Sequence, residues 1–406
     1  MTFDSNHIKS ENKPRLIFID LARSIAIILM IEGHFTGAAL SIEYQNADYL
    51  LYTVWHAIHG LTSPLFFTIT GVIFVYLLSA DNSVSFYKND RVKKGFRRVL
   101  QLIFWGYFIQ LDLWGITKSI YYGSKFYLDW FYAFHVLQSL GFGIFFLLLV
   151  YGLFKWINRG SLYWYYLVSG LIMFVVFGYL RNYIQMDKLA IANALEDGKI
   201  LSPNYFPHNS PGFLQNMFYG RFSEFTFVRY SIYILLGGML GSIIRKYENK
   251  TKEWWFGTIF VVGGLVLIFC TIPILRSMDI LFKKEALTHG RFFALTSFEF
   301  IRFGQVVSLL GILILIVKFF QIKARLFLKI GQNTLPIYIV HVIILYGGIF
   351  GFGLNPLVVN QNQNPWISIG ISAAAILLFT LMIRKIEYLQ EKYSAFIRLI
   401  SFKNKK

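Results

Sequence analysis

Runs of apolar residues recur along the whole chain and are separated by short polar segments. A helix needs about 20 such residues to cross the hydrocarbon core of a bilayer, at about 1.5 Å per residue. Suitable runs lie at about residues 16–40, 52–79, 98–117, 130–154, 161–180, 226–245, 254–275, 296–317, 332–350 and 366–383. Isolated strands cannot satisfy their backbone groups in lipid, so we expect every run to be helical. The pattern predicts an all-α, polytopic membrane helix bundle of about ten transmembrane helices.

Composition supports a membrane protein that has the lipid bilayer as a partner. The 406 residues are 56% hydrophobic and only 15% charged. A formal net charge of +18 is also typical of nucleic-acid-binding proteins, but here the basic residues cluster in short segments between the apolar runs. Such clusters are typical of cytoplasmic loops, so we expect no nucleic-acid partner. The single cysteine, Cys270, excludes an internal disulfide framework.

The distribution of Lys and Arg predicts the orientation in the membrane. The N-terminal tail, the 80–98 loop and the tail after Arg384 are basic, whereas the 41–51 and 351–365 loops contain no Lys or Arg. Because basic loops stay on the cytoplasmic side, we expect both termini to be cytoplasmic. The chain then resembles a multi-pass protein of a bacterial cytoplasmic (inner) membrane.

These patterns predict that the chain has three parts. Residues 1–15 form a cytoplasmic tail that lacks the apolar core and cleavage site of a signal peptide, so we expect the first span to be retained. Residues 16–383 form the membrane domain, and residues 384–406 form a basic cytoplasmic tail. The long outer loop at 181–225 is rich in aromatic residues, which suit either a carbohydrate-binding surface or the lipid interface.

The first apolar run is unusual because it carries Asp20, Arg23, Glu32 and His34. Ionisable groups within a span are costly and usually face a bundle interior or a wet cavity. Ten residues separate Arg23 from His34, so the two share a helix face at different depths. The alternative is structural: Asp20 can neutralise Arg23, and His34 can lie at the membrane interface.

Histidines of the second run lie near the same outer surface. His56 and His59 are spaced i, i+3 at its start, so three imidazoles from adjacent helices, including His34, are expected to converge. Three histidines can bind a metal ion in principle, and Glu32 and Asp48 are near in sequence. The usual carboxylate ligands are not placed with them, so we predict no metal site.

The ninth run opens with G-Q-N-T-L-P-I-Y-I-V-H. Asn333 is predicted to cap this helix. Tyr338 and His341 share a face, about 10 Å from the cytoplasmic side and at a depth similar to that of Arg23. A cation, a phenol and an imidazole are therefore expected at one level.

Other polar groups allow two interpretations. Gln138 in the fourth run is either part of a site or a hydrogen-bonding contact between helices. Glu299 and Arg302 are spaced to form an ion pair on one helix face. The basic 80–98 loop reflects either topology and anionic lipid or a docking patch for a phosphorylated cytosolic cofactor. Metalloprotease, P-loop, dinucleotide and nucleophile-elbow motifs are absent from the sequence.

Four segments resemble a known group of enzymes. I-D-L-A-R followed by I-L-M-I-E-G-H resembles the opening helix of the transmembrane acyltransferase superfamily, whose acyltransferase family 3 members carry an Arg and a His separated by ten residues. H-G-L-T-S-P-L-F-F-T-I-T-G resembles that group's outer-face histidine and the proline and phenylalanine-glycine run after it. H-V-L-Q-S-L-G is similar to the V-L-Q element of heparan-alpha-glucosaminide N-acetyltransferase and its bacterial relatives. G-Q-N-T-L-P-I-Y-I-V-H resembles the G-x-x-S-L-x-x-Y-x-x-H start of a late helix in both branches.

The resemblance implies an enzyme that moves an acyl group, commonly acetyl, from cytosolic acyl-CoA to a sugar or polymer across the membrane. It implies that Arg23 lies toward the donor and that a histidine of the first two helices assists the acceptor's attack. The chain lacks the N-G and D-L-V-F-P run of the lysosomal enzyme, which leaves the choice between His56 and His59 open.

Depth along the helices suggests a division of roles. We expect the CoA phosphates to bind at the basic loop and the pantetheine arm to lie in the bundle interior. An outer imidazole, whose ordinary pKa is about 6.5, then takes the proton of the acceptor hydroxyl or amine. Transient acylation of a histidine is an alternative that the sequence leaves open. Support of His34 by Glu32 is also open, because residues two apart diverge around a regular helix unless Gly33 distorts it. The catalytic candidates are Glu32, His34, His56 and His59, and the cofactor-binding candidates are Arg23, Arg91, Arg97, Arg98, Gln138, Asn333, Tyr338 and His341.

A transporter or flippase for a sugar-linked or lipid-linked substrate is the main alternative function. Such proteins also need polar residues in the membrane, but they usually show related halves, and we find no convincing internal repeat. A non-catalytic membrane sensor would leave the polar stripes unexplained. The acceptor, the acyl length, O- versus N-acylation and the oligomeric state, a homodimer included, are left open by the sequence.

Overall fold

The computed structural model describes residues 16–80, 84–124, 129–196, 210–218, 223–282, 293–322, 324–355 and 360–403. Within these residues the chain is helical, and the extended pairing is limited to one isolated bridge between Leu40 and Gln363. The expectation of an all-α bundle is therefore confirmed. The predicted N-terminal tail, residues 1–15, lies outside the described part.

Helices α1 to α8 are Ile17–Ala39, Leu50–His59, Thr62–Leu78, Asp90–Phe108, Leu113–Tyr121, Asp129–Tyr132, Val136–Ile157 and Leu162–Glu196. Helices α9 to α15 are Gly212–Phe218, Phe227–Lys246, Trp254–Leu281, Ser297–Phe319, Arg325–Gln332, Thr334–Tyr346 and Pro365–Lys403. Short 3-10 turns are Ile42–Tyr44, Phe86–Lys88, Glu248–Lys252, Ala294–Thr296 and Gly348–Phe350.

Seven helical segments of the described chain are long and apolar enough to cross a membrane, and two bent helix pairs pass the same test together. The bent pairs are α4 with α5, at 41°, and α13 with α14, at 76°. Helix α1, 23 residues long, lies outside this set and accounts for the first predicted run. By length and composition the described residues supply seven spans, or nine if each bent pair is one span, and α1 is not among them.

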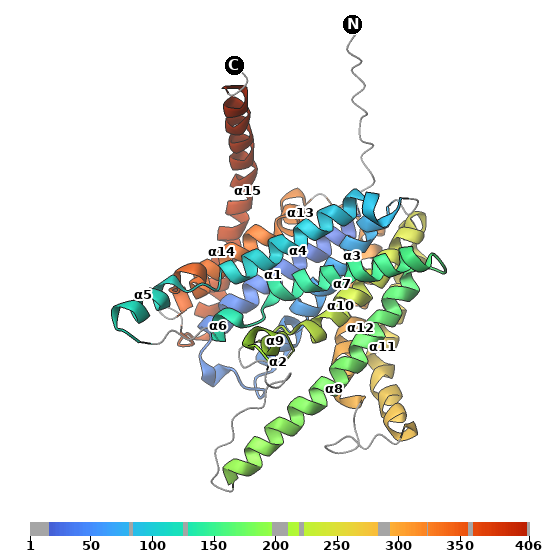
Figure 1. Ribbon diagram of the computed structural model, residues 1–406, viewed down its shortest axis with the longest axis horizontal. Coiled ribbons are helices and arrows are strands. Elements are labelled where there is room, and N and C mark those ends of the chain that lie inside the picture. Colours follow the sequence, from blue (N-terminus) through green and yellow to red (C-terminus); the bar gives the residue numbers. More distant parts are fainter. Residues whose placement is uncertain are drawn as a thin grey trace.

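Several helices differ in extent from the apolar runs that predicted them. Residues 332–350, expected as one span, form the shorter helix α14 and the 3-10 turn Gly348–Phe350, and α13 precedes them at a 76° bend. Helix α8 continues to Glu196, so the first part of the predicted 181–225 loop is helical. Helix α15 continues from the last span to Lys403, and both α8 and α15 extend beyond the bundle in Figure 1.

Close helix packing organises the middle of the bundle. Helices α3 and α10 contact each other along their length, as do α11 and α12. A Cβ atom at Gly237 of α10 would overlap the backbone carbonyl of Thr68 in α3, and one at Gly71 would overlap that of Ile234. Small residues allow such close approach, which is how membrane helices gain packing energy without a hydrophobic driving force.

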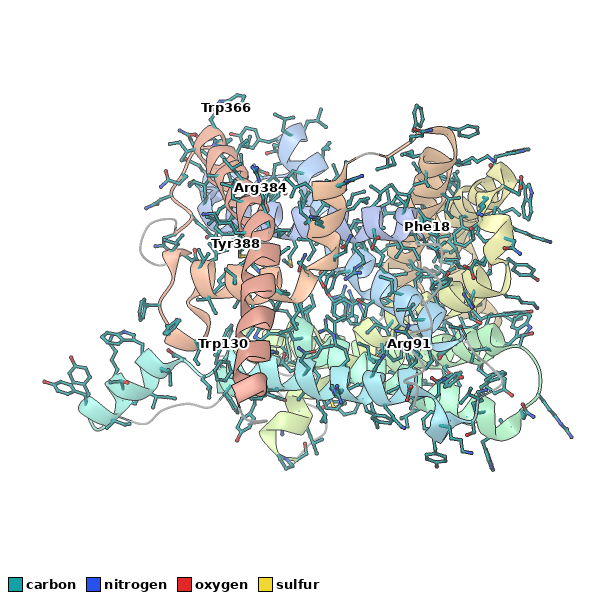
Figure 2. The ribbon with its side chains drawn as sticks, turned by 90° about the horizontal axis from the view of Figure 1, so that it is seen from above. Phe18, Arg91, Trp130, Trp366, Arg384 and Tyr388 are labelled. Atoms are coloured by element: carbon teal, nitrogen blue, oxygen red, sulfur yellow. The ribbon has the colours of Figure 1, made fainter. Side chains whose placement is uncertain are left out.

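Aromatic side chains occur both in the buried interior and at the exposed edge of the bundle. Phe18 near the start of α1 is 4% exposed, whereas Trp366 at the start of α15 is 82% exposed and lies at the edge of the bundle in Figure 2. Helix α1 packs against α3, α12, α13, α14 and α15. The ionisable residues of α1 therefore face protein on several sides.

Candidate active site

A pocket of about 280 Å³ lies between α1, α3, α4, α7 and α14. Its lining follows α3 from Phe66 to Leu78, a rise of roughly 18 Å at 1.5 Å per residue. Apolar side chains, including Leu137 and Leu140 of α7, cover much of the wall. The polar lining residues are Arg23, Thr70, Arg91, Lys94, Arg98, Thr334 and Tyr338.

Helical spacing on α4 explains how the cations reach this pocket. Arg91, Lys94 and Arg98 are spaced i, i+3 and i+7, so they share one face of the helix, and all three line the pocket. Arg97 is exposed on another face and does not line it. Asn89 caps α4 by accepting a hydrogen bond from the backbone N–H of Arg91, 2.8 Å away.

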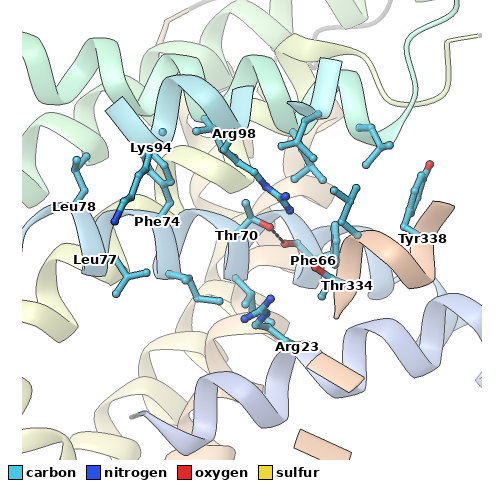
Figure 3. A pocket seen from close by; sticks show the side chains of 18 of the residues that line it. Arg23, Phe66, Thr70, Phe74, Leu77, Leu78, Lys94, Arg98, Thr334 and Tyr338 are labelled. Carbon is cyan, nitrogen blue, oxygen red and sulfur yellow. Dashed lines mark hydrogen bonds between the residues drawn. The ribbon is translucent and has the colours of Figure 1, made fainter. Parts of the chain in front are cut away.

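Two guanidinium groups converge inside the pocket. Arg23 extends from α1 and Arg98 from α4, and both point toward Thr70 in Figure 3. Arg98 also donates to Gln101 Oε1 at 3.0 Å, and Arg23 lies 4.0 Å from Asp20 on its own helix. None of the described lining residues is Asp or Glu. The pocket is therefore positively charged and suited to an anionic ligand.

Tyr338 connects this pocket to a second group of residues. Its ring centroid lies 5.0 Å from that of His341, which in turn lies 5.3 Å from that of His34. His341 is fully buried, and its Nδ1 lies 3.3 Å from the carbonyl oxygen of Ile337. A carbonyl can only accept a hydrogen bond, so this contact assigns the proton to Nδ1. Nε2 of His341 is buried without a hydrogen-bond partner among the described residues.

The outer cluster consists of His34, His59 and Tyr346. His34 Nδ1 lies 2.8 Å from the Tyr346 hydroxyl, at the C-terminal end of α14. The imidazoles of His34 and His59 are 6.4 Å apart and nearly perpendicular, at 85°. A Cβ atom at Gly33 would overlap the His59 ring, so glycine at this position lets α2 bring His59 against α1.

The two candidates of α2 have different surroundings. His59 is half-buried beside His34, whereas His56 is exposed and stacks on Tyr52 with ring centroids 5.7 Å apart. Among the described contacts, His56 has none with His34. The geometry therefore favours His59 as the histidine that acts with His34.

Glu32 does not bond to His34 in the described contacts. Its Oε1 accepts hydrogen bonds from the Thr36 hydroxyl, 2.9 Å away, and from the Trp55 indole N–H, 2.8 Å away. Helix α1 is continuous through Gly33, so Glu32 and His34 point in different directions.

Gln138 and Asn333 lie outside the pocket lining. Gln138 is fully buried and donates a hydrogen bond to the side-chain oxygen of Gln110, with Gly106 providing space for it. Asn333 occupies the predicted N-cap position of α14, but its side chain donates to the Lys329 carbonyl at 3.0 Å and makes no cap hydrogen bond to α14. The 76° bend at this junction turns α14 away from α13.

The predicted pair between Glu299 and Arg302 was wrong. Glu299, 1% exposed, accepts a hydrogen bond from Arg229 Nε of α10 at 3.0 Å. Arg302 instead donates to the Ala57 carbonyl at 2.8 Å and so contacts the residues beside His59. The i, i+3 spacing of Glu299 and Arg302 was not sufficient for an ion pair, because Arg229 of α10 lies closer to Glu299.

Several residues of the site were not among the candidates predicted from the sequence. Lys94 had a signal, since it follows Arg91 by three residues on the basic face of α4. Trp55 also had one, because it precedes His59 by four residues. Tyr346 had none, since its partner His34 is 312 residues away in the chain. No group of three His, Cys, Asp or Glu residues that could hold a metal ion occurs in the described ranges.

Comparison with known families agrees with this arrangement. The profile of the acyltransferase 3 family, described as an acyltransferase domain, matches residues 16–385, which includes the pocket and the histidine cluster. A search of curated proteins gave no match. The family match covers most of the chain and favours an enzyme over a transporter. The chain therefore belongs to the acyltransferase 3 family and is a multi-pass membrane acyltransferase.

Proposed function

We propose that this acyltransferase moves an acyl group, specifically acetyl, from cytosolic acyl-CoA to a hydroxyl or amine of an extracytoplasmic sugar or glycopolymer. The membrane is then the bacterial cytoplasmic membrane, with both termini of the chain in the cytoplasm. In this arrangement the basic pocket opens inward and the histidine cluster lies near the outer surface.

The observation that carries the proposal is that four positively charged side chains line one pocket whose described lining contains no Asp or Glu. Arg23 of α1 and Arg98 of α4 both point toward Thr70, and Lys94 and Arg91 lie farther along α4. Like charges gathered at one site repel one another, and a polyanion relieves this repulsion. CoA carries such charges on its phosphates, and its pantetheine arm suits the apolar wall along α3.

The reaction needs a base on the acceptor side. With Nδ1–H of His34 donating to the Tyr346 oxygen, Nε2 keeps a lone pair that accepts the proton of the attacking hydroxyl or amine. The nucleophile bonds to the thioester carbonyl, the C–S bond breaks, and the leaving CoA thiolate takes the proton from His34 Nε2. His59 lies across from His34 and contacts the acceptor from the other side.

Continuity between the two regions supports transfer across the membrane. Arg23 and His34 are eleven positions apart on α1, or roughly 16 Å. Tyr338 and His341 lie between them and belong to one helix face of α14. An extended donor that has its phosphates near Arg98 would therefore direct its thioester toward His34.

The direct test is ligand-dependent stability of the purified protein in detergent. Acetyl-CoA is expected to raise Tm in a concentration-dependent way, because a ligand that binds only the folded state stabilises it. Free CoA should act similarly, and acetyl phosphate should have a smaller effect because it lacks most of the contacts. Absence of a shift with acetyl-CoA and with longer acyl-CoAs would contradict acyl-CoA as the donor.

A further inference from the structure

Trp55 connects two of the outer residues that otherwise do not touch. Its indole N–H donates to Glu32 Oε1 at 2.8 Å. Its ring stacks on the imidazole of His59 with centroids 5.3 Å apart and planes within 5° of parallel. One side chain therefore contacts the carboxylate of α1 and the imidazole of α2.

Few contacts with the rest of the protein fix helix α2. It spans Leu50–His59, forms one apolar membrane segment with α3, and has no buried residue. Leu50 and Leu51 on its outer face are 75% and 86% exposed. The position of the His59 ring, at its last residue, thus depends on a few side-chain contacts.

Glu32 is fixed on the other side of Trp55. The Thr36 hydroxyl, one turn along α1, donates to the same Oε1 at 2.9 Å. Two donors on one oxygen restrict the carboxylate to a single orientation, and that orientation sets the plane of the indole. The carboxylate charge of Glu32 acts on His59 directly, but the described contacts include no hydrogen bond from Glu32 to either imidazole. Any orienting effect of Glu32 on the His59 ring therefore passes through Trp55.

We propose that Trp55 is the positioning residue of the outer cluster: Glu32 orients its indole, and the indole holds the His59 imidazole against Gly33 and facing His34. The inference rests on the proposed function, because it assumes that His59 and His34 act together on the acceptor. It assigns Glu32 a supporting role in place of direct acid–base chemistry.

Kinetics of Trp55 variants test this role. Transfer is followed as CoA thiol released from acetyl-CoA, with a panel of hexoses, hexosamines and their polymers as acceptors. Trp55→Ala is expected to lower kcat at least tenfold and to leave KM for acetyl-CoA within twofold, since Trp55 does not line the donor pocket. Trp55→Phe keeps a stacking ring but loses the N–H, so its kcat should lie between those of the wild type and Trp55→Ala. A smaller active fraction would also lower the apparent kcat at unchanged KM, so kcat is expressed per acetyl-CoA binding site counted by titration.

Glu32 variants separate positioning from acid–base catalysis. Glu32→Gln keeps an oxygen acceptor for the indole N–H and should retain at least a third of the wild-type kcat. Glu32→Ala should match Trp55→Phe, and the double variant Glu32→Ala/Trp55→Phe should be no worse than either, because both remove one contact. A Glu32→Gln variant as inactive as Glu32→Ala, together with a fully active Trp55→Phe, would overturn the inference.

A measurement without turnover keeps the two proposals apart. The rate at which diethyl pyrocarbonate modifies His59, read by mass spectrometry, should rise at least fivefold in Trp55→Ala and in Glu32→Ala. The matched control is Trp366→Phe, at a tryptophan that is 82% exposed, and it should change neither this rate nor kcat. An unchanged His59 rate in Trp55→Ala overturns the inference even if acyl transfer occurs. If His59 responds as expected but no acyl group is transferred by the wild type, the proposed function fails instead.

Discussion

The inner pocket and the outer histidine cluster are built in different ways. The pocket is lined by side chains from long continuous helices, and its cations repeat along one face of α4. The cluster is assembled near helix ends, from the last residue of α2, the last residue of α14 and the C-terminal third of α1. Charge attraction acts over several ångströms, whereas proton transfer requires hydrogen-bond contact. This difference explains why hydrogen bonds and ring contacts fix the outer residues, while the inner cations simply face a common space.

The largest expected effect is on kcat and comes from a change in the outer cluster alone. His34→Ala removes the proposed base and should lower kcat by roughly 10²- to 10⁴-fold, the usual contribution of general base catalysis. The acetyl-CoA-dependent rise in Tm should persist, because His34 does not line the pocket. Full activity of this variant in the CoA-release assay would remove His34 from the mechanism.

The next largest effect is on the Kd for acetyl-CoA and comes from a change in the inner pocket alone. Arg98→Ala should raise the Kd for acetyl-CoA roughly 10- to 100-fold, since a hydrogen bond to a charged group contributes about 1.5–3 kcal/mol. Isothermal titration in detergent measures the change directly. The matched control is Arg97→Ala, one residue away but exposed and outside the pocket, and its Kd should stay within about twofold. Equal losses in the two variants would indicate a general surface charge effect.

A smaller effect tests how the outer cluster is held. Tyr346→Phe removes the hydroxyl that lies 2.8 Å from His34 Nδ1 and leaves the ring in place. Loss of one such hydrogen bond, at about 0.5–1.5 kcal/mol, should lower kcat roughly 3- to 10-fold and leave the Kd for acetyl-CoA unchanged. A Tyr346→Phe variant with wild-type kcat would show that His34 is oriented by other contacts.

The smallest effect distinguishes the two histidines of α2. His56 is exposed and contacts Tyr52, so His56→Ala should change kcat by less than about twofold. His59→Ala, measured in parallel, should lower kcat at least tenfold. The reverse order of these two variants would assign the acceptor side to His56 and exclude the His34–His59 arrangement.

Sequence reasoning predicted parts of the site. Arg91 and Arg98, both expected at the donor site, line one pocket, whereas Arg97, expected with them, does not, and Lys94, which was not among the candidates, does. Arg23 and Tyr338, expected at a common depth, line the same pocket. Spacing failed for Glu299 and Arg302, whose partners come from other segments. Asn333 occupies the predicted cap position, but its side chain bonds to the preceding helix α13.

The sequence by itself determined that the chain forms membrane helices, that Arg23 and His34 share one face of the first span, and that this span carries charged residues. Those features depend on a rotation of about 100° per residue and on the cost of unpaired groups in lipid, both of which act locally. The tertiary structure alone decided that His59 and not His56 faces His34, that Glu32 contacts Trp55, and that Tyr346 reaches His34. These contacts join residues up to 312 positions apart, and they depend on where α2 ends, how sharply α13 turns into α14, and how closely Gly33 lets a neighbouring ring approach.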